Sequence, residues 1–169
     1  GVTFQLADVL GVDREIGWGL STRRRAPEVE EHFITRDLTG GLDDGEGTPD
    51  IVVTSPATRV LDAADGQVRL AVHELGRGRT VYATGLPYSA QNSRLLHRAI
   101  FWAAGCQEEF SAWAALDPRV EVAAYPDRRT TLVINNSLEP VTTTVPTPRG
   151  PQTVRLEEGG HQWLTAASQ

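Results

Sequence analysis

The sequence predicts a layered α/β domain, incomplete at its N-terminus, followed by a small antiparallel β domain. Between residues 68 and 105, two apolar segments with the alternation of strands precede one well-marked helix. Beyond this helix, short β segments separated by turns follow one another without a helical pattern. We therefore place a domain boundary near Gln107, which assigns residues 1–106 to the α/β domain and residues 107–169 to the β domain.

The α/β domain is organised around a predicted pair of strands. Val68, Leu70 and Val72 alternate with polar or small neighbours, which is typical of a strand buried on one face. The sequence GRGR at 76–79 predicts a tight turn, because glycine accepts the positive φ that a reversal requires. The next segment, 80–85, is predicted to be a second strand, whose small residues would let a neighbouring backbone approach closely.

One helix is predicted from about residue 90 to residue 104. Ser89 is the expected N-cap, with Asn92 as a second candidate, and Gly105 stands where a left-handed C-cap belongs. The apolar residues recur at helical spacing. The face expected to pack against the strand pair consists of Leu95, Leu96, Ala99 and Ala103.

Shorter elements are predicted before this core. Residues 4–10 have a helical pattern that Gly11 ends. Residues 60–64 could form a strand or a turn, and Asp65-Gly66 is typical of a hairpin turn. Short strands are expected at residues 16–20, 32–35 and 51–53.

The second domain is predicted to be a small antiparallel sandwich or sheet. Its β segments are short, and turn-forming residues separate them at the spacing of such folds. The expected strands are residues 120–126, 130–136, 140–146, 153–157 and 161–166.

Composition excludes several classes of protein. The net charge of −6 argues against electrostatic binding to nucleic acid. The longest apolar runs are far shorter than the roughly 20 residues of a membrane helix. A single cysteine, Cys106, allows no intrachain disulfide, and we expect a cytoplasmic protein. The first residues contain no Met, no basic region and no cleavage signal, so we expect the chain to be cut from a longer one.

Charged clusters suggest sites but do not specify them. The arginine run at 23–25 could bind an anion, or could lie in a solvated loop compensated by the acids after it. The acidic loop, residues 39–50, lacks the ligand spacing of a calcium loop. The GRGR sequence lacks the full glycine pattern and the Lys-Ser/Thr end of a phosphate loop, so a hairpin turn is the better interpretation.

No residue pattern indicates a reaction. Cys106 has no nucleophile elbow around it, and the four histidines form no metal-ligand pair such as H-x-x-x-H. Tyr125 and Trp163 could stack on a sugar, although aromatics in sandwiches more often belong to the core. From the residues alone we assign no catalytic, cofactor-binding or metal-binding residue.

Four segments of the chain resemble a known protein family. In order along the chain stand QLADVLGVDREIGWGLST, HFITRDLTGGLDDGEGTPDI, GRGRTVYATGLPYSAQNSRLLHRAIFWAAG and VINNSLEPVTTTV. Together they resemble the C-terminal portion of the 1,3-β-galactosyl-N-acetylhexosamine phosphorylases, also called lacto-N-biose or galacto-N-biose phosphorylases. The GLPYS-x-x-NSRLLHRAIFWAAG block is the most specific part of the match.

The resemblance implies a catalytic (β/α)-barrel followed by an amidotransferase-like, Rossmann-like α/β domain and a C-terminal β domain. It implies an inverting enzyme of the glycosyltransferase class, without organic cofactor or metal. Such an enzyme cleaves lacto-N-biose or galacto-N-biose with phosphate to galactose 1-phosphate and the N-acetylhexosamine. The barrel, which would bind most of the disaccharide and the phosphate and supply the acid, is missing here.

Two functions are therefore open. The first is a non-catalytic C-terminal part of such a phosphorylase, inactive alone, which packs on the barrel of the same polypeptide and could form a homodimer. The second is a free-standing carbohydrate-binding or interaction module. For the first, Leu86 and Tyr88 are the candidate docking residues, because they follow a strand and precede a helix N-terminus. They could equally cover only the start of that helix.

Overall fold

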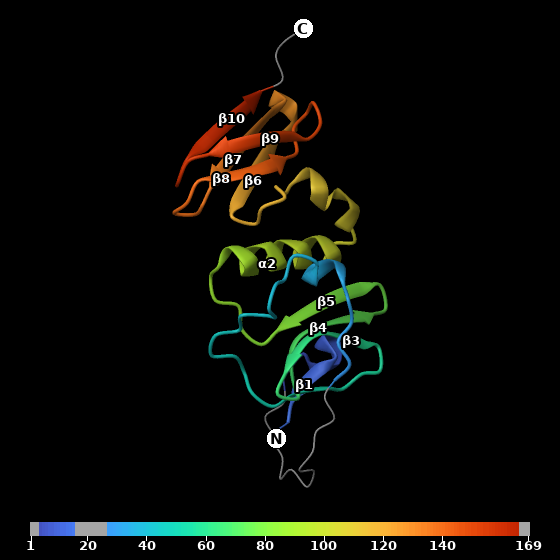
Figure 1. The fold of residues 1–169 in the computed structure, drawn as a ribbon. Helices are drawn as coiled ribbons and strands as arrows, with labels where there is room; N and C mark the ends of the chain where they lie inside the picture. The colour runs from blue at the N-terminus through green and yellow to red at the C-terminus, as the bar shows by residue number, and fades with distance from the viewer. Residues whose placement is uncertain (1–3, 16–26, 166–169) are drawn as a thin grey trace. The chain divides into compact units, whose positions relative to one another are not determined.

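The computed structural model describes residues 4–15 and 27–165 (Figure 1). The chain divides into two compact units, Gly1–Gly105 and Cys106–Gln169, which are described separately. The strand predicted at residues 16–20 and the arginine run at 23–25 lie outside the described residues. In the described part of the chain, no helix is both long and apolar enough to cross a membrane.

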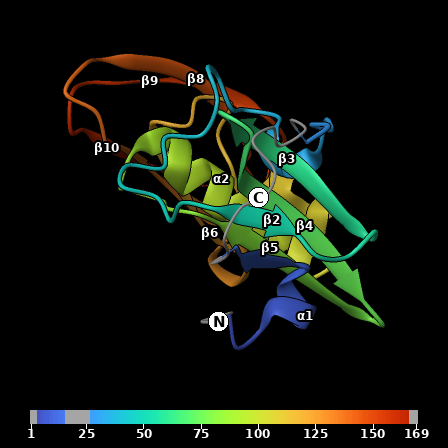
Figure 2. The same ribbon diagram turned by 90° about the horizontal axis from the view of Figure 1, so that it is seen from below.

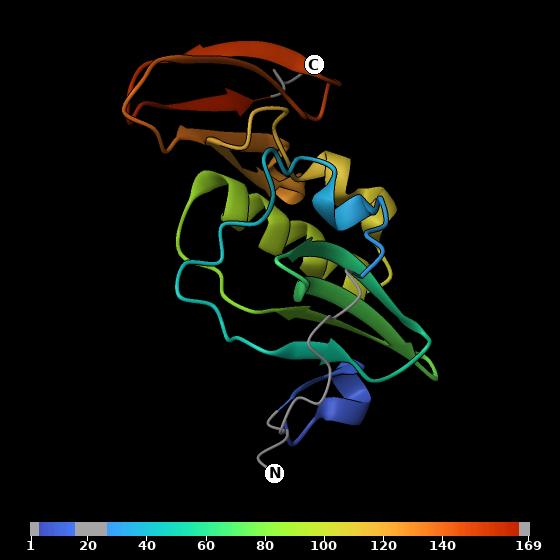
Figure 3. The same ribbon diagram turned by 60° about the horizontal axis from the view of Figure 1, so that its bottom comes forward.

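The first unit is built on an antiparallel sheet with the strand order β3-β4-β5. A separate antiparallel pair joins β1 to β2. The helix α2 lies on one side of the larger sheet, and α1 and β1 lie on the other (Figures 1 and 3). Seen from below, β2 passes over β4 and β5 (Figure 2). The elements are α1 Ala7–Leu10, β1 Val12–Arg14, the 3-10 helix η1 Phe33–Thr35, β2 Ile51–Val53, β3 Thr58–Ala64, β4 Gln67–Leu75, β5 Gly78–Ala83 and α2 Ala90–Ala103.

The predicted amidotransferase-like, Rossmann-like α/β fold is wrong. Every pairing between named strands in the described residues is antiparallel, and the sheets are small. Hairpin turns join β3 to β4 and β4 to β5, whereas parallel strands need crossover connections of a dozen or more residues. The helix α2 follows the last strand of its sheet, so it covers the sheet without linking two parallel strands.

The strand β4 is buried on both faces, not on one face as predicted. Leu70 and Val72 belong to the apolar cluster beneath α2, whereas Val68 and Ala71 belong to a second cluster with β1 and β2. The register between β3 and β4 shifts at Asp62, where consecutive paired positions skip a residue. A β-bulge of this kind exchanges the faces of neighbouring residues. This explains why Val68 and Leu70 enter different clusters although they are two residues apart.

Both predicted caps of α2 are confirmed. The Ser89 hydroxyl accepts a hydrogen bond from the backbone N–H of Asn92 at 3.0 Å, and Gly105 has a φ of 74°. The buried face of α2 differs in part from the prediction. Leu95 and Ala99 are buried as expected, but Leu96 is 48% exposed.

The buried face of α2 shares Leu95 and Ala99 with the predicted face but differs from it at other positions. Ala103 is exposed, and Trp102 is buried instead. Arg94 and Arg98 are also buried on this helix, and both make ion pairs with Asp37. Long side chains with charged ends can bury their stems in this way, and an apolar pattern does not reveal it.

The predicted strand at residues 32–35 is also wrong. This segment contains the 3-10 helix η1, in which His32 is the N-cap and its Nδ1 accepts a hydrogen bond from the Ile34 N–H at 3.2 Å. Ile34 is buried in the cluster beneath α2. A single buried residue in four cannot distinguish a short strand from one helical turn.

The second unit consists of two small antiparallel sheets, one with the order β10-β7-β6 and one joining β8 to β9. Each strand lies within two residues of its predicted range at either end. Valines dominate the apolar cluster, and β7 and β8 bury alternate residues. The elements are η2 Gln107–Ala112, β6 Val120–Tyr125, η3 Pro126–Arg128, β7 Thr130–Asn135, β8 Val141–Val145, β9 Gln152–Leu156 and β10 His161–Thr165.

Candidate functional site

The acidic loop, residues 39–50, is held against the end of β5 and the first turn of α2. The Asn92 amide donates to the backbone oxygen of Asp43 at 2.9 Å and to that of Pro87 at 2.7 Å. The Gln91 Oε1 accepts from both the N–H and the hydroxyl of Thr39. The contacts of Asn92 and Gln91 with the loop span about 50 residues of sequence, so the start of α2 fixes the course of the loop.

Arg69 provides a second anchor for the acidic loop. Its guanidinium donates to the backbone oxygen of Leu42 and to the Asp44 carboxylate, the latter at 2.7 Å. Its Nε lies 3.5 Å from a carboxylate oxygen of Asp62. The Leu42 side chain is almost fully buried. Burial of Leu42 and the Arg69–Asp44 ion pair therefore hold the same part of the loop.

Small residues allow the loop to approach β5 closely. A Cβ added to Gly85 would lie well inside van der Waals contact with the backbone oxygen of Asp44. On the loop side, a Cβ on Gly47 would be 2.8 Å from the Thr84 side chain. Thr84 also donates its hydroxyl to the backbone oxygen of Thr48 at 2.7 Å. The expected close approach of a backbone to the segment 80–85 is therefore confirmed at Gly85.

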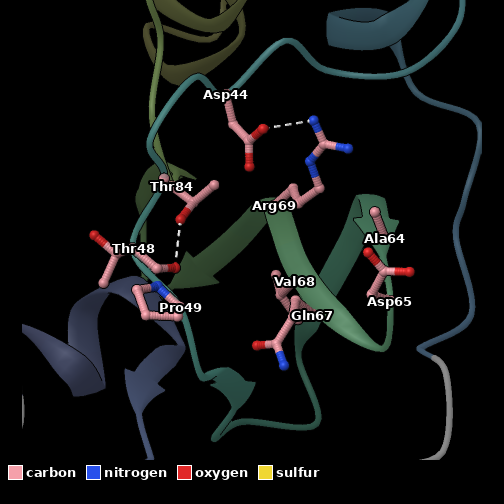
Figure 4. A pocket seen from close by; sticks show the side chains of 10 residues that line it. Asp44, Thr48, Pro49, Ala64, Asp65, Gln67, Val68, Arg69 and Thr84 are labelled. Atoms are coloured by element: carbon pink, nitrogen blue, oxygen red, sulfur yellow. Dashed lines mark hydrogen bonds and ion pairs between the residues drawn. The ribbon is translucent and has the colours of Figure 1, made fainter.

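A polar pocket of about 210 Å³ opens between this loop and β4 (Figure 4). Asp44 and Arg69 face each other on one side, and Thr48 and Thr84 lie together on another. Asp65, in the turn before β4, also lines the pocket. The ion pair between Asp44 and Arg69 holds the loop in place. The pocket lining offers hydrogen-bonding groups to small polar molecules.

Burial is the main cause of the shifted pKa values of His32 and Tyr82 in this unit. Burial and the Arg59 charge hold the pKa of His32 below its usual value, against the opposing charges of nearby carboxylates. Burial raises the pKa of the Tyr82 phenol, although the Thr84 and Thr48 hydroxyls act in the opposite direction. Burial disfavours the charged form in both cases, as it does for structural residues.

The other residues considered from sequence do not converge on a site. The segment GRGR is the hairpin between β4 and β5, with Gly76 at a φ of 61°. His73 is buried, and its ring bridges the Val9 backbone oxygen and the Ser55 hydroxyl, so it links α1 to the sheet. Cys106 begins the second unit as the residue before η2. Among residues 4–15 and 27–165, no three His, Cys, Asp or Glu side chains are placed to hold a metal ion.

The candidate docking residues occupy different environments. Leu86 packs partly against the apolar cluster beneath α2. Tyr88 is 87% exposed. The residue between them, Pro87, lies against Gly45 of the acidic loop.

Sequence reasoning missed Arg69 and assigned Asn92 only a possible capping role. In the strand pattern, Arg69 occupies a polar alternate position, which normally indicates a solvent-facing side chain. Asn92 lies within a helix whose cap is Ser89, and its true partners are 5 and 49 residues away. No local signal in the sequence identifies such partners.

Comparison with known protein families matches both units. Residues 1–108 match the family model described as the lacto-N-biose phosphorylase central domain. Residues 113–164 match the model described as the lacto-N-biose phosphorylase C-terminal domain.

Individual relatives agree with these matches. A 1,3-beta-galactosyl-N-acetylhexosamine phosphorylase of Lachnoclostridium phytofermentans is 39% identical over 98% of this chain and 23% of its own length. The 1,3-beta-galactosyl-N-acetylhexosamine phosphorylase of Bifidobacterium longum is 35% identical over 98% of this chain and 26% of its own length. A D-galactosyl-beta-1->4-L-rhamnose phosphorylase of L. phytofermentans is 30% identical over 79% of this chain and 18% of its own length.

The chain thus spans about a quarter of the length of the first two relatives, in their C-terminal portion. The family models follow the order of the two units, and the segments that first suggested the family lie within them. This chain belongs to the lacto-N-biose phosphorylase family, of which it contains the central and C-terminal domains.

Proposed function

We propose that this chain is the non-catalytic C-terminal part of a phosphorylase that cleaves β-1,3-galactosyl-N-acetylhexosamine with phosphate. The products would be galactose 1-phosphate and the N-acetylhexosamine. The observation that carries the proposal is the match to both family domains in order, with 39% identity over 98% of the chain. Asp44, one of the residues that line the pocket beside the acidic loop, supports a structural role, since its carboxylate is bound to Arg69.

In this proposal the catalytic barrel of the same polypeptide is the main partner. The barrel would supply the acid that protonates the leaving oxygen and would bind most of the disaccharide and phosphate. The two units of this chain would pack on that barrel and could contribute to a homodimer. We propose a cytoplasmic location for the whole enzyme, a setting compatible with a chain whose one cysteine forms no internal disulfide.

A chimera tests the proposal. The matching segment of the Bifidobacterium phosphorylase is replaced by this chain, and release of galactose 1-phosphate from lacto-N-biose and phosphate is measured. Release at a rate within about tenfold of the parent enzyme is expected. A folded chimera that releases no galactose 1-phosphate would contradict the proposal.

The docking residues are tested in the same chimera. Tyr88→Asp places a charge on a side chain that is 87% exposed here, so it should leave this unit folded and weaken the contact with the barrel. Leu138→Asp is a matched control, because Leu138 is 89% exposed in the second unit. If Tyr88→Asp and Leu138→Asp have equal effects on activity and thermal stability, Tyr88 is not part of the docking surface. The double variant Leu86→Asp/Tyr88→Asp extends the test to a residue that also packs on its own core.

A further inference from the structure

An exposed aromatic pair lies on the outward face of the sheet β10-β7-β6. The rings of Tyr125 and Trp163 have centroids 5.8 Å apart and planes at 36°. Trp163 is 54% exposed and Tyr125 is 41% exposed, so the interpretation of these aromatics as core residues is wrong. Alternate residues of the same strands, such as Val133 and Leu164, belong to the apolar cluster or pack against it.

Trp163 of this aromatic pair also lines a pocket of about 270 Å³. Trp163 and Thr165 of β10 line one part of it, and Thr147, Arg149 and Gln152 around the β8–β9 turn line another. The turn is fixed internally. The Thr147 hydroxyl donates to the Gly150 backbone oxygen at 2.7 Å and accepts from the Arg149 N–H at 3.2 Å.

The groups at this pocket match the chemistry of a sugar ring. A pyranose has one face rich in C–H groups, which can lie on an indole ring, and a rim of hydroxyls, which need donors and acceptors. Trp163 offers the apolar surface, and the side chains of Gln152 and Thr165 offer both donors and acceptors. Among the described residues that line the pocket, none carries a carboxylate, an imidazole or a thiol. This lining suits binding and not bond cleavage.

We infer that the pocket lined by Trp163 is a binding site for a neutral hexopyranose, held by stacking on Trp163 and by hydrogen bonds with the side chains of Gln152 and Thr165. The volume lies near the lower limit of the roughly 300–1,000 Å³ of typical small-molecule pockets, which suits one sugar ring. The inference concerns binding by the second unit and does not require that the proposed phosphorylase activity be correct.

The test titrates the full 169-residue chain with galactose, N-acetylglucosamine and lacto-N-biose at millimolar concentrations. The indole N–H signal of Trp163 in the ¹H–¹⁵N spectrum reports binding, with Trp163→Phe used to assign it. A saturable shift is expected with at least one sugar, together with a tenfold or greater loss of affinity in Trp163→Ala. Gln152→Ala should weaken binding several-fold without disturbing the core, since its side chain is exposed. Tyr88→Ala is the matched control, because it removes an exposed aromatic of the other unit.

Three results would overturn the inference. The first is the absence of a saturable shift at the Trp163 signal with all three sugars. The second is binding that survives Trp163→Ala and Gln152→Ala in variants whose amide spectra remain native. The third is full competition by inorganic phosphate, which would make this an anion site around Arg149. None of these results concerns release of galactose 1-phosphate, so the two proposals fail independently.

Discussion

The two units of this chain build their cores in different ways. In the second unit, one cluster of mainly valines belongs to two small sheets, and β7 and β8 each bury alternate residues. In the first unit, β4 contributes to two separate clusters, one beneath α2 and one with β1 and β2. The first unit also depends on polar anchors between distant segments, notably Arg69 and Asn92. Alternating burial therefore describes the strands β7 and β8 of the second unit, where buried Asn135 also donates to the Glu157 backbone oxygen. It does not describe β4 of the first unit, which contributes to two clusters.

The largest expected effect tests the position of α2 over the first unit. Leu95 is 3% exposed in the cluster beneath the helix, so Leu95→Ala should lower the free energy of unfolding by about 2–5 kcal/mol. Leu96→Ala is the matched control and should cost less than about 0.5 kcal/mol. Denaturant melts measure both. Equal losses would mean that the buried face of α2 is assigned wrongly.

The next effect tests the close approach of the acidic loop to β5. Gly85→Ala should destabilise the first unit by about 3 kcal/mol, because the new Cβ would overlap a backbone oxygen that cannot rotate away. Gly78→Ala is the control, since its Cβ would lie 3.5 Å from its nearest neighbour. Thermal melts of the two variants should differ clearly. A neutral Gly85→Ala would show that the loop does not pack on β5 as described.

Substitution of a valine by alanine tests the core of the second unit. Val133 is fully buried in β7, so Val133→Ala should cost about 1.5–3 kcal/mol. Thr142→Ala alters an exposed position of β8 and should be close to neutral. Hydrogen exchange followed by residue separates the two units. Lost protection is expected in β6, β7 and β10, and equal loss in α2 would show that the units unfold as one.

The smallest effect concerns His32 and its pH dependence. Its pKa is lowered in the folded protein, so its contribution to stability is present above the unfolded value of about 6.5 and is lost as the pH falls through the folded pKa. His32→Asn keeps an acceptor for the Ile34 N–H but does not titrate. Melts between pH 7.5 and 5 should show the parent losing stability relative to the variant. Parallel pH curves for the two proteins would exclude this contribution.

The difference between the two units also explains how much of the fold could be predicted from sequence. The strands of the second unit and both caps of α2 were predicted correctly, because each depends on neighbours within a few residues. The fold class of the first unit was wrong, because a strand pair followed by a helix fits both a layered α/β domain and an antiparallel sheet with one covering helix. The bulge opposite Asp62 and the buried Arg94 and Arg98 depend on partners far along the chain.

Only a small part of the candidate site could be predicted from the sequence. Local sequence predicted that a backbone could approach the small residues of segment 80–85, and the structure shows this approach at Gly85. Local sequence could not place Arg69 on the acidic loop, since the guanidinium reaches Asp44 across 25 residues of sequence. Nor could it distinguish a core Trp163 from an exposed one, because strand alternation near the C-terminus is short.

The central claim, that these two units assist a phosphorylase without performing its chemistry, is tested most directly by an assay of the chain alone. The purified chain is incubated with lacto-N-biose and phosphate, and galactose 1-phosphate is measured, with the Bifidobacterium relative as the positive control. We predict no galactose 1-phosphate above a protein-free blank. Turnover that rises in proportion to the concentration of this chain would contradict the account.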